Sequence, residues 1–122
     1  MILRSGVDLV EIQRFADLRP GIRSRFIQRI LTQDEQREVN DSLPTLAGKF
    51  AAKEAVVKAL GCGIGLVSWQ DIEILHDDQG QPILYLYRHA LQIANELMLT
   101  HWTVSISHTR LQAVATAVFI GA

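Results

Sequence analysis

The sequence predicts an α+β domain in which one long central helix packs on a mainly antiparallel β-sheet. Three features of the chain point to this fold class. Residues 46–60 form a proline-free run of mostly helix-forming residues, strand-like apolar segments lie on both sides of it, and short turns separate several of these segments. A length of 122 residues suits one domain, residues 1–122, with a core large enough to fold.

The first strand is expected at residues 2–10, where aliphatic and β-branched side chains are interrupted by Asp8. A carboxylate within an apolar strand must be ion-paired, hydrogen-bonded or metal-bound, because burying it bare is very unfavourable. On this ground alone, Asp8 is either a structural acid or a metal ligand.

Three short helices are expected next. They lie at about 11–16, 24–30 and 32–41. Pro20 and Gly21 are expected to break the first of them. The third begins at Thr32, because Thr32 and Glu35 have the spacing of a capping box, in which each side chain bonds the backbone N–H of the other residue.

The central helix is expected at 46–60, shortly after Pro44, a residue that suits a helix entrance. It must end at Gly61, because Gly61, Gly63 and Gly65 alternate and glycine readily adopts the left-handed conformations that end helices. We therefore expect a helix of about four turns followed by a glycine-rich loop.

Beyond the glycines the apolar pattern changes to that of strands. The expected elements are strands at 71–76 and 82–87, a helix at 88–99, and strands at 102–108 and 113–120. Only short connections separate the two strands of each pair, so two antiparallel hairpins are predicted.

The charge is unevenly distributed, although the net charge is only −1. The stretch 14–29 carries five arginines against one acid, and the stretch 34–41 is acidic. A local basic patch favours an acidic protein partner, whereas nucleic-acid binding would call for a basic chain as a whole.

The composition also bears on location. No apolar segment is long enough for a membrane helix, and the first residues lack the features of a signal peptide, so we expect a soluble protein without a membrane role. The single cysteine, Cys62, excludes an intrachain disulfide and gives no metal-ligand spacing. A cytoplasmic location is the simplest expectation.

Glu54 and Lys58 are four residues apart and therefore lie on one face of the central helix, together with Phe50. Such a pair has two interpretations. It can be a partly buried charged site at the end of an apolar stripe, or a solvated surface pair that stabilises the helix by about 0.2–0.5 kcal/mol. The glycine run that follows favours the first.

Two motifs together make a specific resemblance. The stretch Phe50-Ala-Ala-Lys-Glu-Ala-Val-Val-Lys-Ala-Leu-Gly-Cys-Gly63 resembles the second signature of the phosphopantetheinyl transferases of the holo-acyl-carrier-protein synthase type, a helix reading F-A-x-K-E-A-x-x-K-A that runs into G-x-G. Gly6-Val-Asp8-Leu-Val-Glu11 resembles the first signature, a strand ending in G-x-D followed by an acidic residue. Both motifs stand in the family's order in a chain of the family's usual length, and the resemblance extends from the first strand to the last.

The resemblance implies the fold of this family and a magnesium-dependent transferase. Such an enzyme moves the 4′-phosphopantetheine group of coenzyme A to a serine of an apo acyl carrier protein, releases adenosine 3′,5′-bisphosphate and supports fatty acid biosynthesis. It implies Asp8 and Glu54 as Mg²⁺ ligands, and Asp8, Glu54 and Lys58 as catalytic residues. Glu54 would also act as general base, preferably through a water, and Lys58 would neutralise the leaving bisphosphate.

Coenzyme A is the implied substrate of this site. Its implied contacts are Lys49, Lys58, Gly61, Gly63, Pro82, Ile83, Ser107 and His108. Lys49 and His108 are expected at the 3′-phosphate, and Pro82 and Ile83 form a wall for the adenine.

The resemblance also implies two protein partners. The acyl carrier protein is expected to dock its acidic recognition helix on Arg14, Arg23 and Arg25, which lie in the basic stretch. Single-domain members of the family are similar in forming a cyclic trimer with the coenzyme site between neighbouring subunits, so a homotrimer is expected here.

Two departures from the family pattern concern the glycine loop and the first strand. Cys62 stands where a threonine is usual, which weakens any hydroxyl contact there, and Arg4-Ser5 replaces a more glycine-rich beginning. Two other functions remain open on the sequence. One is a noncatalytic module that binds coenzyme A or a carrier protein, and the other is a small metal-dependent phosphohydrolase that uses the same carboxylates.

Overall fold

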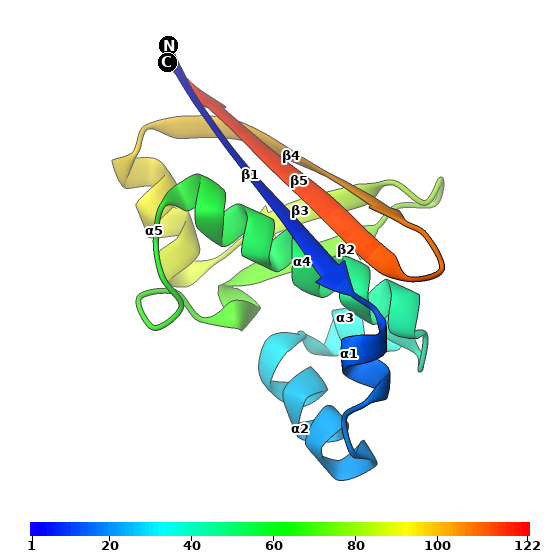
Figure 1. Cartoon of the computed structure of the whole chain (residues 1–122). Coiled ribbons are helices and arrows are strands. Elements are labelled where there is room, and N and C mark those ends of the chain that lie inside the picture. Colours follow the sequence, from blue (N-terminus) through cyan, green and yellow to red (C-terminus); the bar gives the residue numbers. More distant parts are fainter.

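In the computed structural model, which describes residues 1–122, the long helix α4 (Leu43–Leu60) lies against one face of a three-stranded antiparallel sheet (Figure 1). The strands run in the order β1 (Ile2–Glu11), β5 (Gln112–Gly121) and β4 (Leu99–His108). The predicted α+β fold with a central helix on an antiparallel sheet is confirmed.

The first and last strands of the chain pair along their whole length, from Ile2 opposite Gly121 to Glu11 opposite Gln112. Both chain ends therefore meet at one tip of the sheet (Figure 1). Because β5 is the middle strand, it is the only strand that pairs with β1.

Small residues let α4 approach this sheet closely. Ala113, Ala115 and Ala117 on the buried side of β5 are at most 1% exposed. At Gly6 of β1, a Cβ atom would lie 2.0 Å from the carbonyl oxygen of Ala55 in α4, so only glycine fits there. The helix backbone thus rests almost directly on the first strand.

A second, two-stranded antiparallel sheet is formed by β2 (Ile72–His76) and β3 (Pro82–Leu86). The remaining helices are α1 (Gln13–Ala16), α2 (Pro20–Ile30), α3 (Gln33–Val39), the 3₁₀ helix η1 (Trp69–Asp71) and α5 (Arg88–Glu96). A hydrogen bond of 3.2 Å from the indole nitrogen of Trp102 in β4 to the carbonyl oxygen of Leu84 in β3 joins the two sheets. None of the helices is both long and apolar enough to cross a lipid bilayer.

A buried ion pair ties α4 to α3 and β2. The ammonium of Lys53 lies 2.7 Å from a carboxylate oxygen of Glu35, and both side chains are 0% exposed. The other carboxylate oxygen of Glu35 accepts a hydrogen bond of 2.8 Å from the backbone N–H of Ile74. Burial lowers the pKa of Lys53, and the charge of Glu35 opposes that effect. Removing either partner alone would leave an uncompensated buried charge.

The boundaries of several elements differ from the sequence prediction. Pro20 does not break a helix but occupies the first turn of α2, where its fixed φ and missing N–H are favourable. The central helix begins earlier than expected, because Ser42 caps it and Pro44 lies in its first turn. The predicted capping box at Thr32 is confirmed, and so is the end of α4 at Gly61, which has φ +68°.

Candidate active site

Glu54 and Lys58 are the two residues in the buried stretch of α4 that are accessible to solvent. Every residue from Leu46 to Leu60 is buried except Glu54, which is half-buried, and Lys58, which is exposed. The pair therefore does not belong to a solvated helix face, because the helix has no such face over this stretch. Of the two interpretations that the sequence left open, the structure supports the charged site.

Asp8 lies beside this pair because β1 runs along α4. The strand turns its even-numbered residues towards the helix, and Asp8 follows Gly6 on that side, with its side chain 17% exposed. The ammonium of Lys58 donates hydrogen bonds to the Oδ1 atom of Asp8 at 3.1 Å and to the carbonyl oxygen of Val7 at 3.0 Å. The residues Asp8 and Lys58 from the two sequence motifs are thus in direct contact.

Glu54 shares the electrostatic environment of Asp8. Burial raises the pKa of Glu54 most, and the negative charge of Asp8 raises it further, whereas Lys58 and Arg14 oppose the rise. Arg14 comes from α1, and its guanidinium carbon lies 5.5 Å from the centre of the Phe50 ring, within range of a cation–π contact. Two carboxylates and two cations therefore converge where α1, β1 and α4 meet.

The donor set indicates which kind of cation this site can hold. Nowhere in the structure do three or more His, Cys, Asp or Glu residues gather as a metal-binding group. Asp8 and Glu54 alone supply two carboxylates, which fits Mg²⁺, because that ion is usually bound by one or two carboxylates together with substrate phosphates and waters. The same set does not fit a structural zinc ion, which takes four protein ligands.

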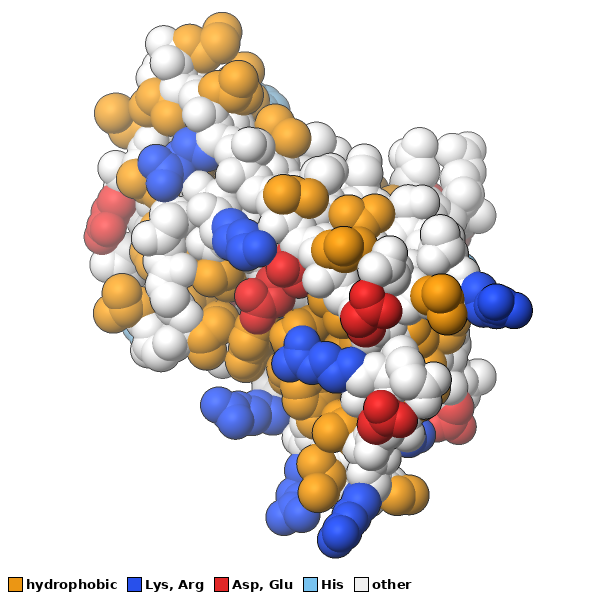
Figure 2. All heavy atoms as spheres, in the orientation of Figure 1, with side chains coloured by type: hydrophobic (Ala, Val, Ile, Leu, Met, Phe, Trp, Pro, Cys, Tyr) orange, Lys and Arg blue, Asp and Glu red, His pale blue; other side chains and the backbone are white.

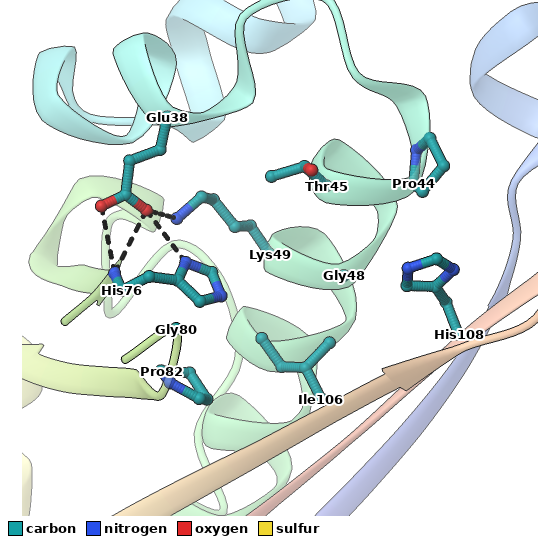
Figure 3. A pocket seen from close by; sticks show the side chains of 10 residues that line it. All are labelled: Glu38, Pro44, Thr45, Gly48, Lys49, His76, Gly80, Pro82, Ile106 and His108. Carbon is teal, nitrogen blue, oxygen red and sulfur yellow. Dashed lines mark hydrogen bonds and ion pairs between the residues drawn. The ribbon is translucent and has the colours of Figure 1, made fainter. Parts of the chain in front are cut away.

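A cavity of about 480 Å³ lies at the other end of α4, around its first turns (Figure 3). Its lining residues are Glu38, Pro44, Thr45, Gly48, Lys49, His76, Gly80, Pro82, Ile106 and His108. Three residues predicted to contact coenzyme A, namely Lys49, Pro82 and His108, are therefore brought together around one hollow. They come from α4, β3 and the end of β4.

Lys49 does not present a free ammonium to this cavity. Its side chain is 0% exposed, and its Nζ atom bonds the Glu38 carboxylate at 2.7 Å and the carbonyl oxygen of Ile74 at 2.5 Å (Figure 3). The charge of Lys49 is therefore balanced by Glu38, and its contact with the 3′-phosphate stays a prediction. His108, in contrast, is exposed.

Glu38 and His76 are cavity residues that the sequence reasoning missed. The Nδ1 atom of His76 lies 3.0 Å from the Oε1 atom of Glu38. The Oε2 atom of Glu38 accepts a hydrogen bond of 3.0 Å from the backbone N–H of His76. Burial alone would raise the pKa of Glu38, but the hydrogen bonds from Lys49 and His76 outweigh it and lower that pKa. No spacing signal could have revealed the contact, because it joins α3 to the end of β2.

Ile83 and Ser107 lie apart from the cavity. Ile83 is 37% exposed on β3 and does not line it. Ser107 precedes His108 in β4, and because side chains alternate along a strand, it points to the opposite, open face of the sheet. Their predicted contacts with coenzyme A stay predictions.

The glycine loop lies at the C-terminal end of α4. Gly61 caps α4 twelve residues beyond Lys49, which places it about 18 Å away along the helix axis, and Gly63 follows it in the loop. Both are exposed, and a guanidinium N–H of Arg4 donates to the carbonyl oxygen of Ala59 at 2.7 Å, next to Gly61. The predicted coenzyme contacts therefore form two groups, one at each end of α4.

The predicted carrier-binding arginines differ in their surroundings. Lys and Arg side chains gather at the end of the molecule formed by α1 and α2 (Figure 2). Arg25 is exposed there, but the guanidinium of Arg23 donates to the carbonyl oxygens of Phe15, Ala16 and Leu18 at 3.0–3.1 Å. Arg23 thus links α2 to the end of α1, and its predicted contact with a carrier is untested.

The chain matches known proteins over nearly its whole length. A sequence model of the 4′-phosphopantetheinyl transferase superfamily matches residues 4–118. The holo-[acyl-carrier-protein] synthase of Herpetosiphon aurantiacus is 43% identical over an alignment of 127 positions. The alignment covers 98% of this chain and 100% of the relative. The holo-[acyl-carrier-protein] synthase of Natranaerobius thermophilus is 41% identical over 121 residues, with 97% of each chain covered.

Solved structures share the fold. The holo-[acyl-carrier-protein] synthase of Helicobacter pylori in complex with coenzyme A has a TM-score of 0.85 and 30% identity, covering 95% of this chain and 99% of that one. The synthase–coenzyme A complex of Chronobacterium ammoniagenes has a TM-score of 0.86 and 28% identity, covering 100% and 99%. Both sequence motifs meet in one site and nearly the whole length is matched, so the chain belongs to the 4′-phosphopantetheinyl transferase superfamily.

Proposed function

We propose that this chain transfers the 4′-phosphopantetheine group of coenzyme A to a serine of an apo acyl carrier protein, as one transferase domain that serves fatty acid biosynthesis. The observation that carries the proposal is the meeting of Asp8, Glu54 and Lys58 beside the otherwise buried helix α4. The name of its relatives, holo-[acyl-carrier-protein] synthase, supports the same reaction. A cytoplasmic place of action is part of the proposal, and the single cysteine of the chain supports it.

The proposed reaction needs positive charge around a diphosphate. Asp8 and Glu54 would hold Mg²⁺, which when bound would neutralise part of the phosphate charge. Lys58, on the exposed side of the pair, adds a second positive charge for the leaving bisphosphate. Transfer of the phosphoryl group is then driven mainly by positioning and by electrostatic stabilisation.

Glu54 is the proposed general base. It takes the proton of the carrier serine, either directly or through one water. Without a metal, the burial of Glu54 and the nearby charge of Asp8 raise its pKa. A bound Mg²⁺ would make the same carboxylate a weaker base, so the route through a water is preferred.

We assign the adenosine end of coenzyme A to the cavity at the first turns of α4. His108 and Pro82 line it, and an exposed imidazole at its edge can donate to a phosphate oxygen. Lys49 contributes directly only if a phosphate replaces its bond to Glu38. Ile83, Ser107, Gly61 and Gly63 remain predicted contacts.

The carrier protein is assigned to the end formed by α1 and α2. Arg14 lies beside both Glu54 and Phe50, and Arg25 is exposed on the next helix, so an acidic surface docked there would bring its serine close to the carboxylates. Electrostatic docking of this kind weakens with salt.

We also propose a homotrimer in which sites lie between subunits. The outer face of the three-stranded sheet exposes a row of apolar side chains. They are Leu3, Val7, Leu9, Val118 and Ile120, with exposed fractions of 36–69%. A patch of this kind on an otherwise well-packed domain favours burial against another chain.

Intact mass spectrometry of an apo acyl carrier protein tests the reaction. Incubation with this chain, coenzyme A and Mg²⁺ should add one phosphopantetheine group, about 340 Da. The gain should be lost with a chelator and with Glu54→Gln, but not with Glu96→Gln, which changes an exposed glutamate at the end of α5.

The outcomes separate the competing functions. Coenzyme A binding without any mass gain would leave a noncatalytic binding module. Release of adenosine 3′,5′-bisphosphate without carrier would indicate a phosphohydrolase. In the same assay, Arg25→Glu should raise the KM for carrier far more than the KM for coenzyme A, and equal effects would contradict the docking assignment.

A further inference from the structure

Lys58 occupies the place where a cation is expected. Its ammonium is the only positively charged group within ion-pair distance of Asp8 in the whole chain, at 3.1 Å from Oδ1. It is also one of the two cations whose charge lowers the pKa of Glu54. In the absence of a metal, Lys58 is thus the counter-ion of a pair of carboxylates.

The surroundings of Lys58 allow it to leave. Its side chain is 52% exposed, and besides Asp8 it bonds only the neutral carbonyl oxygen of Val7. Lys49 and Lys53, in the same helix, are 0% exposed and each bonds a carboxylate together with backbone carbonyls. These two are fixed in place, whereas Lys58 can exchange Asp8 for solvent or for another anion.

A divalent cation that binds the Oδ1 atom of Asp8 comes within a few ångströms of this ammonium. Like charges at a few ångströms repel, and the repulsion is stronger next to a partly buried carboxylate than in bulk water. A phosphate that binds the ammonium would relieve the conflict, because it draws Lys58 away from Asp8 and frees that carboxylate.

We propose that Lys58 competes with the metal ion for Asp8 and releases it when a phosphate of the substrate takes the ammonium. Cation binding and coenzyme binding are therefore cooperative, and linkage requires each to strengthen the other by the same factor. The inference rests on the assignment of Asp8 and Glu54 as cation ligands in the proposed function.

Cation binding, rather than turnover, tests the proposal. Without coenzyme, Mg²⁺ and Mn²⁺ are titrated calorimetrically into the wild type and into Lys58→Met, which removes the charge and shortens the side chain by one atom. We expect Lys58→Met to bind the cation about tenfold more tightly, a typical size for coupling between sites. Coenzyme A should then tighten cation binding more in the wild type than in the variant, so that the difference in cation affinity between the two proteins becomes smaller.

Two further variants serve as controls. Arg29→Met removes one positive charge from an exposed position in the last turn of α2 and should leave the cation affinity unchanged. Lys58→Arg keeps the charge and should retain the weak affinity of the wild type. If Lys58→Met does not fold, Lys58→Gln replaces it as the test, because it also removes the charge that contacts Asp8.

The proposal would be overturned if Lys58→Met bound the cation no more tightly than the wild type. It would also be overturned if coenzyme A did not change the cation affinity of the wild type and of Lys58→Arg. The test is separate from that of the reaction. A carrier that gains the expected mass while Lys58→Met binds cations as the wild type does would refute the competition alone. Tighter binding by Lys58→Met with no mass gain would support the competition and refute the transferase.

Discussion

Glu38 illustrates how a single residue can link stability to pH. It is surrounded by Lys49 and by two donors of His76, and its pKa is lowered from the ordinary value of 4.5. An acid whose pKa is lower in the folded state binds protons more readily when unfolded. Its stabilising effect is therefore fully present well above pH 4.5 and is lost as the pH falls through the folded pKa.

Glu38→Gln should lower the free energy of unfolding at pH 7 by about 1–3 kcal/mol, because the ammonium of Lys49 loses its charged partner. Urea denaturation at several pH values should show the gap to the wild type closing below pH 4.5. The exposed Glu96→Gln should show no comparable gap at any pH. A gap that persists unchanged to pH 3 would contradict the role of this carboxylate.

Asp8, Glu54 and Lys58 could be predicted from the sequence because two short motifs contain them, and the structure brings them together. The state of Lys49 could not be predicted. Lys49, Lys53 and Lys58 stand in one helix, but only tertiary packing decides which side chain is buried and which is exposed to solvent. A sequence pattern carries no information about the α3 and β2 residues that surround the first two.

At the scale of elements, the contact between β1 and α4 sets the distance between the two motifs. Gly6 lies two residues before Asp8, and Ala55 directly follows Glu54. The close approach of Gly6 to the carbonyl oxygen of Ala55 therefore controls how near the two carboxylates come. The glycine of the first motif is needed for packing, while the aspartate supplies the chemistry.

Gly6→Ala should separate the strand from the helix, because its Cβ would lie 2.0 Å from a backbone oxygen that cannot move aside. We expect a loss of stability of about 1–3 kcal/mol and weaker Mg²⁺ binding. Gly21→Ala is the matched control, because a Cβ there meets nothing within 4 Å, and it should stabilise α2 by up to about 1 kcal/mol. Thermal melts measure the stability, and calorimetric titration measures the Mg²⁺ affinity. Equal stability and equal Mg²⁺ affinity of Gly6→Ala and Gly21→Ala would refute the role of Gly6 in the close packing.

Most helices and both hairpins could be predicted because their signals are local. The pairing of β1 with β5 could not, since the two strands lie at opposite ends of the chain. The pattern of β1 is also misleading. Leu3, Val7 and Leu9 point outwards, whereas Gly6 and Asp8 face the helix, so apolar alternation would assign the buried face to the wrong side.

At the scale of the whole molecule, the apolar outer face of the sheet predicts self-association. Multi-angle light scattering at micromolar concentration should give three times the mass of the chain. Val118→Lys places a charge in the middle of this face and should yield monomers with reduced transfer activity. Leu91→Lys, on α5 with a similar exposed fraction of 37% against 39%, should remain trimeric. A wild-type monomer would refute the proposed assembly.

The pairing of the first strand with the last one determines when the site can form during synthesis. β1 precedes all the other elements of the fold, but its only strand partner, β5, follows them and must insert between β1 and β4. Contacts of such high sequence separation form slowly, because closing the long loop between them costs entropy before any pairing is gained. Until that insertion, β1 lacks its sheet neighbour. The carboxylates of Asp8 and Glu54 can therefore take up their final positions only after β5 has been made and paired with β1, and a chain that stops before β5 should be inactive.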